Sequence, residues 1–152
     1  MKTQIRNNVF ETNSSSVHSI VYSKAGLEPC KIRRNKNNEI VVDYGQFDKD
    51  ERLYTSQEDK LSYLVTLIAY IAGNYDGGTN EVYNSYEFER LSEAICEYSG
   101  ASGIHIKDKE TPYIDHQSIP GICSGCIIDF YDSDDVINFV FNKDISLHTT
   151  CD

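Results

Sequence analysis

The chain has 152 residues, with 24 Asp and Glu against 14 Lys and Arg and a formal net charge of −10 at pH 7. A chain of this length buries enough surface to fold as one domain over residues 1–152, so neither a disulfide nor a metal is needed for folding. It contains no apolar run of membrane-spanning length and no signal-peptide pattern, which predicts a cytoplasmic protein with no membrane partner and with its five Cys reduced.

The charge is unevenly distributed along the chain. Residues 1–36 hold seven Lys and Arg against two Glu, whereas the rest holds seven basic and 22 acidic residues. Lys and Arg that neutralise phosphates supply most non-specific affinity for nucleic acid, so the acidic body excludes generic DNA binding. Two functional alternatives remain beside a merely solubilising surface. Either the basic quarter holds a phosphorylated ligand, or the acidic remainder mimics nucleic acid and occupies a basic groove.

The first third of the chain predicts strands and a hairpin. Residues 17–23 and 39–44 are rich in apolar and β-branched residues, which favours strands. The polar run 33–38 between Ile32 and Ile40 is typical of a hairpin tip.

Two principal helices are predicted next. Residues 55–58, T-S-Q-E, form a capping-box pattern with Thr55 as the cap. An apolar stripe at helical spacing follows and ends at Gly73: Leu61, Leu64, Val65, Ile68, Ile71 and Ala72. The second helix is expected to begin near Asn84 or Ser85 and to stop at Gly100, and residues 75–80 between the helices are expected to form a loop.

The last third returns to strands. Residues 104–106 and 126–130 predict strands, separated by a Pro-containing stretch at 111–121. Ser133 is expected to cap a short helix through Phe141, and 145–149 a final strand. The whole pattern predicts an α+β fold: a mainly antiparallel sheet of about six strands with two principal helices and one short helix.

Two Ser- and His-containing segments predict a ligand site. Hydroxyl and amide side chains in 11–18, a basic cluster, and the Y-I-D-H-Q-S stretch at 113–118 together suit an anion. The candidate ligand-binding residues are Glu11, Asn13, Ser14, Ser15, Ser16, His18, Arg33, Arg34, Asp115, His116, Gln117 and Ser118. His18 and His116 would be the acid–base pair if the chain cleaved a phosphodiester, although only His116 shows the His-x-Ser spacing. The alternative is that these side chains satisfy local backbone groups in a turn.

Cysteine and histidine spacing suggests a zinc site. Cys123 and Cys126 form a C-x2-C pair, and His148 and Cys151 follow as H-x2-C. Four such ligands can surround zinc tetrahedrally. The alternative is that these Cys are ordinary thiols and small core residues. No other cofactor is expected.

A third set of residues predicts a protein interface. The chain has 11 Tyr and no Trp, and several Tyr lie among acidic residues near the two principal helices. Amphipathic rings on a charged surface suit partner binding. The candidate interface residues are Tyr75, Asp76, Glu81, Tyr83, Tyr86, Glu87, Glu89, Glu93 and Glu97, with a second acidic stretch at 129–135.

Three motifs carry a family resemblance. The stretch V-F-E-T-N-S-S-S-V-H-S at 9–19 resembles the opening of small proteins carried by bacteriophages and prophages of Gram-positive bacteria. Residues 60–64, K-L-S-Y-L, and the 113–118 stretch look like two further motifs of such proteins. The resemblance implies a phage or prophage product made inside a bacterial cell, where small acidic proteins often disable host defence systems.

These observations predict a protein that acts by binding rather than by turnover. The leading hypothesis is a phage-encoded inhibitor of a host antiviral defence complex, anti-CRISPR-like, whose acidic surface mimics nucleic acid. The alternative is a sponge for a phosphorylated nucleotide signal, or a phosphodiesterase, built from the Ser and His motifs.

Overall fold

The computed structural model describes residues 4–7, 16–22, 26–47, 51–73, 79–114 and 128–151, with backbone only for 4–7, 16–22, 150 and 151. Its helices are α1 Gln57–Ile71, α2 Asn80–Tyr83, α3 Tyr86–Ser99 and α4 Ser133–Phe141. Its strands are β1 Gln4–Asn7, β2 Ser16–Tyr22, β3 Glu39–Val42, β4 Gln46–Phe47, β5 Arg52–Tyr54, β6 Gly103–Ile106, β7 Tyr113–Ile114 and β8 Ser146–Cys151.

The described strands form three small sheets. One is a four-stranded antiparallel sheet in the order β1-β2-β8-β5, and the other two are parallel pairs, β3 with β6 and β4 with β7. The α+β mixture is confirmed, but the described strands do not form the one mainly antiparallel sheet of about six strands that the sequence predicts. In each parallel pair, one strand precedes α1 and the other follows α3 in the chain. This spacing fits, because two parallel strands need a connection long enough to hold a helix.

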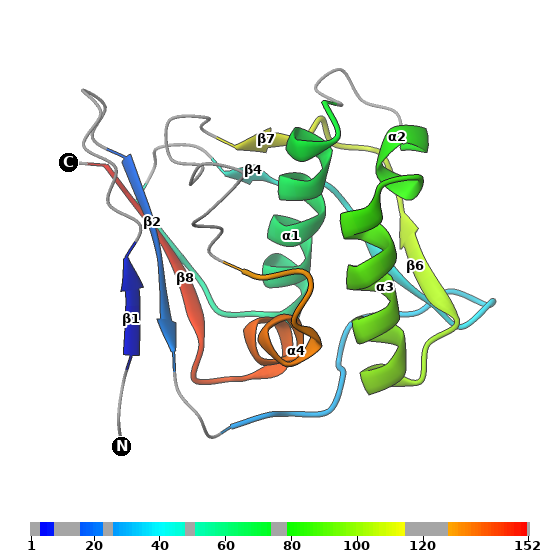
Figure 1. The fold of residues 1–152 in the computed structure, drawn as a ribbon, viewed down its shortest axis with the longest axis horizontal. Helices are drawn as coiled ribbons and strands as arrows, with labels where there is room; N and C mark the ends of the chain where they lie inside the picture. The colour runs from blue at the N-terminus through cyan, green and yellow to red at the C-terminus, as the bar shows by residue number, and fades with distance from the viewer. Residues whose placement is uncertain are drawn as a thin grey trace.

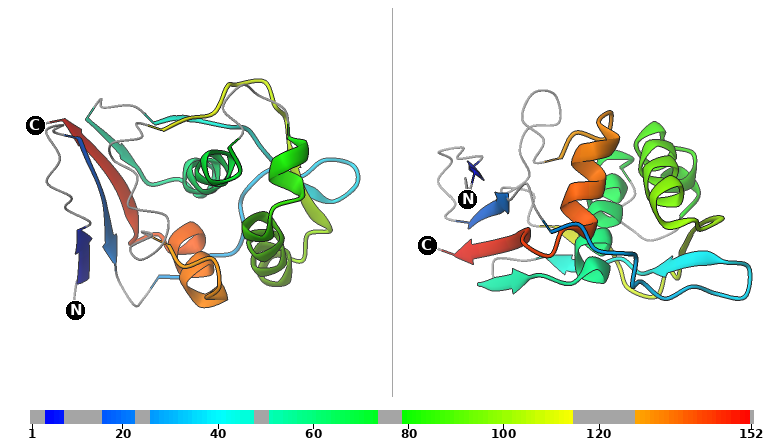
Figure 2. Two further views of the ribbon diagram at one scale, coloured as in Figure 1. Left: turned by 45° about the horizontal axis from the view of Figure 1, so that its top comes forward. Right: turned by 90° about the horizontal axis from the view of Figure 1, so that it is seen from below.

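Helices and sheets occupy different sides of the molecule. Figure 1 shows α1 and α3 side by side, α4 end-on below α1, and the sheet containing β1, β2 and β8 beside them. In the right panel of Figure 2, α1, α3 and α4 stand on one side of β3, β5, β6 and β8. The outer face of α3 therefore lies away from the strands.

The first helix begins one residue later than the sequence predicts. Ser56, not Thr55, is the N-cap: its Oγ accepts from the backbone N–H of Asp59 at 3.0 Å and donates to that residue's carboxylate at 2.7 Å. A Ser-x-x-Asp pair thus replaces the predicted Thr-x-x-Glu box. The predicted apolar stripe is confirmed, since Leu61, Leu64 and Ile68 are fully buried.

The second principal helix matches its prediction. Ser85 is the N-cap of α3, and Gly100 ends the helix with φ +73, a conformation that favours glycine. The loop predicted at 75–80 is only partly described, and its last residue begins the short helix α2, which the sequence did not predict.

The late elements differ from expectation in two places. Asp132 rather than Ser133 caps α4, since its carboxylate accepts from the backbone N–H groups of Asp134 and Asp135. Of the strand predicted at 126–130, only 128–130 is described, and it forms a turn leading into α4. The strands at 39–44, 104–106 and 145–149 and the hairpin at 33–38 are confirmed in outline.

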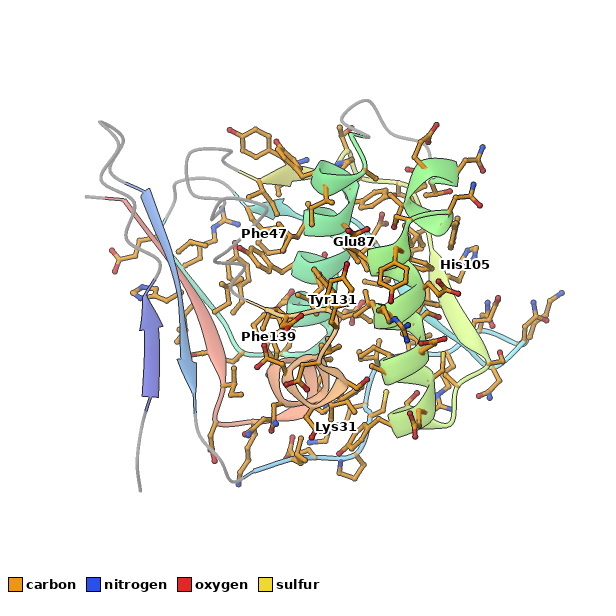
Figure 3. The ribbon with its side chains drawn as sticks, in the orientation of Figure 1. Lys31, Phe47, Glu87, His105, Tyr131 and Phe139 are labelled. Carbon is orange, nitrogen blue, oxygen red and sulfur yellow. The ribbon has the colours of Figure 1, made fainter. Side chains whose placement is uncertain are left out.

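An aromatic chain links helices to strands in the core. The Phe47 ring lies 5.1 Å from Tyr54 and 4.9 Å from Tyr63, both edge-on, and Tyr63 lies 6.4 Å from Phe139. These rings tie β4, β5, α1 and α4 together, and Figure 3 labels Phe47 and Phe139 in this region. A Cβ at Gly45 would collide with the Phe47 ring, so that position admits only glycine.

A buried lysine joins α1 to the end of α4. Lys60 is 0% exposed, and its Nζ donates to the carbonyl oxygens of Asn142 at 2.8 Å and Ile145 at 3.1 Å. A cation favours a helix C-terminus, where carbonyl groups lack partners. Burial lowers the pKa of this ammonium from 10.5 to about 8, and the attraction of Glu28 partly opposes the shift.

The Lys60 shift predicts that stability rises with pH in a defined window. The pKa of this base is lower in the folded chain than in the unfolded chain. Below pH 8 Lys60 is charged in both states, and its buried charge lowers the free energy of unfolding by the full amount. Between about pH 8 and 10.5 only the unfolded chain keeps the proton, so the free energy of unfolding rises with pH. From pH 7 to 9.5 the wild type should gain about 2 kcal/mol of unfolding free energy relative to Lys60→Met. Urea denaturation at the two pH values measures this difference.

Lys36→Met is the matched control, because Lys36 is an exposed lysine on the hairpin tip. This variant should follow the wild type at both pH values. If the free energy of unfolding differs between the wild type and Lys60→Met by the same amount at pH 7 and at pH 9.5, a buried charge at Lys60 is contradicted.

Candidate partner-binding interface

The outer face of α3 carries a row of carboxylates. Glu89, Glu93 and Glu97 are exposed and follow one another at four-residue spacing, whereas Phe88, Leu91 and Ile95 are buried on the opposite side. Residues four apart are neighbours on a helix surface. The amphipathic pattern of α3 therefore places three like charges in one line facing away from the core.

This row works against the stability of its own helix. Like charges at i,i+4 destabilise a helix by about 0.2–0.5 kcal/mol per pair. Glu97 also lies near the C-terminus of α3, where a negative charge is unfavourable, and the last turn contains no basic residue. Glu89, by contrast, lies in the first turn, where the helix dipole favours a carboxylate, so the unfavourable end of the row is Glu97.

One arginine partly neutralises the row. Arg90 Nη1 lies 2.8 Å from the carboxylate of Glu93, and its Nε donates to the Tyr86 hydroxyl at 2.7 Å. The hydrogen bond to Tyr86 raises the pKa of this guanidinium. No ion pair is found in the described part of the chain for the carboxylates of Glu87, Glu89 and Glu97.

The turn before α4 extends the acidic surface. Tyr131 packs against Tyr86 with ring centroids 5.3 Å apart, which brings residues 129–135 beside the start of α3. The carboxylates of Asp129 and Asp132 accept hydrogen bonds from nearby backbone N–H groups, and Asp135 is buried. Asp134 is exposed. We call this surface the acidic face; it comprises Tyr86, Glu87, Glu89, Glu93, Glu97, Tyr131 and Asp134.

Two further predicted interface residues lie on α2. Glu81 is exposed, and Tyr83 accepts a hydrogen bond from the backbone N–H of Ile106 at 2.9 Å and packs edge-on against Phe88. Tyr83 is thus chiefly a support for β6 and α3, beside a cavity of about 580 Å³ that Ser92 and Cys96 also line. Tyr75 and Asp76 lie outside the described residues.

The predicted ligand site is described only in part. Arg33 is exposed, whereas Arg34 donates to Asn38 Oδ1 at 2.8 Å and to the carbonyl of Ser99 at 2.6 Å, at the C-terminus of α3. For Ser16 and His18 the backbone lies in β2, paired with Cys151 and Thr149. The remaining predicted residues lie outside the described ranges: Glu11, Asn13, Ser14, Ser15, Asp115, His116, Gln117 and Ser118.

The zinc hypothesis also stays a prediction. His148 lies on β8 with Nε2 3.7 Å from Glu51 Oε1, and the backbone of Cys151 ends the same strand. Cys123 and Cys126 fall outside the described residues. Within the described ranges, no three His, Cys, Asp or Glu side chains gather as metal ligands would.

A cavity of about 440 Å³ lies where α1 begins and α4 ends. Lys31, Lys60 and Lys143 line it together with Glu28 and Glu58. Lys31 Nζ contacts Glu28 at 2.8 Å, and the Lys60 ammonium is bound to carbonyl oxygens. Two of these three lysines, Lys31 and Lys60, are therefore engaged within the fold.

Sequence reasoning identified the Glu residues of the acidic face but missed Arg90 and Tyr131. Tyr131 stands inside the 129–135 stretch that was selected for its charge alone. An aromatic residue inside an acidic stretch was the signal that the sequence offered, but its contact with Tyr86 joins residues 45 positions apart and depends on how α4 packs against α3.

Comparison with known proteins found no similarity to report: no family model, no curated protein and no solved structure matches this chain. In the ranges that the structure describes, no helix has both the length and the apolar character that crossing a bilayer requires.

The carboxylate row predicts a substitution that stabilises the fold. Glu97→Lys removes repulsion from Glu93, places a cation at i+4 from that glutamate and suits the helix C-terminus. The unfolding free energy should rise by about 0.5–1 kcal/mol at low ionic strength. Glu97→Gln should give a smaller gain, and urea denaturation compares the three proteins. A loss of stability in Glu97→Lys would show that this carboxylate supports the fold.

Proposed function

We propose that this protein acts by binding, and that its acidic face occupies a basic, nucleic-acid-handling surface of a host defence complex. The observation that carries the proposal is the line of Glu89, Glu93 and Glu97, exposed on one side of α3, with Glu97 at the helix end that disfavours a carboxylate. Lost stability is a recurrent cost of functional sites, and a line of exposed like charges fits a role in binding.

The spacing of the row suits an extended basic groove. Four residues of α-helix rise about 6 Å, so the three carboxylates recur at regular intervals over about 12 Å. The partly exposed Glu87 and the exposed Asp134 add negative charge in the first turns of α3 and α4. A groove that normally follows a phosphate backbone with Lys and Arg would meet a similar repeating negative charge here.

The resemblance of residues 9–19, 60–64 and 113–118 to phage and prophage proteins supports the choice of a host defence complex as the partner. A phage product that blocks such a complex needs no catalytic group of its own. Occupation of the groove is sufficient, because the complex then cannot engage phage nucleic acid.

Neutralising the row predicts loss of protection. In a bacterium whose CRISPR–Cas or restriction system targets a test phage, wild-type protein should restore plaque formation. The variant Glu87→Gln, Glu89→Gln, Glu93→Gln, Glu97→Gln should fail to restore it, because electrostatic complementarity is removed. Binding to the purified defence complex should also weaken steeply as salt rises from about 0.05 to 0.5 M, since surface charges are screened.

The matched control changes four acidic residues elsewhere: Glu51→Gln, Glu58→Gln, Asp108→Asn and Glu110→Gln. All four are exposed and lie outside α3 and α4. Each quadruple variant removes four carboxylates, so the two variants change the net charge equally. This control should protect like the wild type. Salt-insensitive binding, or equal loss of protection in both quadruple variants, would contradict a specific role for the acidic face.

A further inference from the structure

An exposed pair of aromatic rings stands within the acidic face. Tyr86 opens α3 and is 42% exposed, whereas Tyr131 lies in the turn before α4 and is 71% exposed. Their centroids are 5.3 Å apart with the rings inclined by 37°. Figure 3 shows Tyr131 and Glu87 near one another between α1 and α3 in this view. A large ring left this open has surface to bury against a partner.

The turn holds Tyr131 in place without covering its ring. The backbone N–H of Tyr131 donates to Asp129 Oδ1 at 2.9 Å, and that of Asp132 donates to the Asp129 carbonyl at 3.1 Å. Asp132 then caps α4. A side chain presented on a fixed turn loses little conformational freedom when a partner binds it.

One ring of this pair, Tyr86, already contacts a guanidinium group within the molecule. The Arg90 guanidinium lies 5.0 Å from the Tyr86 ring centroid, donates to the Tyr86 hydroxyl and pairs with Glu93. The Tyr131 ring, 71% exposed, is open, and the carboxylates of Glu87, next to Tyr86 in the chain, and Asp134, three residues after Tyr131, have no ion pair in the described part of the chain.

We propose that Tyr131 is the anchor of the acidic face and that the partner contacts it with an arginine-rich segment. A partner guanidinium stacks on the open ring and pairs with neighbouring carboxylates, as Arg90 does on Tyr86. Guanidinium is planar and weakly hydrated and stacks on aromatic rings better than a lysine ammonium does. The proposal rests on the proposed function, since it specifies the partner surface that the acidic face binds.

Two peptides of equal charge test the anchor. Fluorescence anisotropy measures binding of labelled octa-arginine and octa-lysine to the wild type, Tyr131→Ala, Tyr131→Phe and Tyr113→Ala. Tyr113 is the matched control, an exposed tyrosine (38%) on β7 away from the acidic face. The wild type should prefer octa-arginine, and Tyr131→Ala should reduce that preference by about two- to fivefold, the size of an exposed cation–π contact.

Octa-lysine binding should be nearly unchanged in Tyr131→Ala, and Tyr131→Phe and Tyr113→Ala should keep the wild-type preference. Equal wild-type affinity for the two peptides, or a preference that survives in Tyr131→Ala, overturns the anchor while leaving the acidic face intact. The quadruple Glu→Gln variant is measured with the same two peptides. If it binds both as tightly as the wild type does, the proposed function is overturned as well.

Discussion

The hydrogen bonds from the Lys60 ammonium to the carbonyl oxygens of Asn142 and Ile145 hold the end of α4 against α1. α1 is the central helix, and α4 leads directly into β8, which pairs with β2 and β5. A buried cation costs free energy, and removing only one side of such a contact leaves polar groups without partners. The position of the four-stranded sheet relative to the helices therefore depends on hydrogen bonds from a lysine nitrogen that is buried in the core.

The same arrangement recurs at α3. Neither α3 nor α4 has a basic residue in its last turn, and in each case a cation from another part of the chain supplies the missing donor: Arg34 at Ser99, and Lys60 at Asn142. Both cations come from earlier in the sequence than the helix they cap. Two of the chain's 14 Lys and Arg are thereby committed to helix ends, and Arg90 is held by Tyr86 and Glu93. For Glu89 and Glu97 on the outer side of α3, no ion pair is found in the described part of the chain.

Stability and binding make opposite demands on α3. Its inner side follows the ordinary rule, with apolar residues buried against α1, α4 and β6. Its outer side places like charges at helical spacing and an acidic residue near the C-terminus, which a helix selected only for stability would avoid. Tyr131, supplied by the turn before α4, adds an aromatic surface to that side. The binding role proposed above would reconcile the two sides, because a basic partner would supply cations for Glu89 and Glu97, which have no ion pair in the described part of the chain.

Local sequence determined the three longer helices and, to within one residue, their ends, because caps and apolar periodicity act over three or four residues. Ser85 and Gly100 bound α3 as predicted, the caps of α1 and α4 shifted by one residue to Ser56 and Asp132, and the short helix α2 was not predicted. Charge composition likewise selected the glutamates of α3. Only the tertiary structure decided that strands pair in parallel across α1 and α3, that Arg34 donates to the Ser99 carbonyl at the end of α3, and that Tyr131 meets Tyr86. These outcomes join residues 45 or more positions apart, and no local pattern encodes which distant groups will satisfy each other once the core has closed.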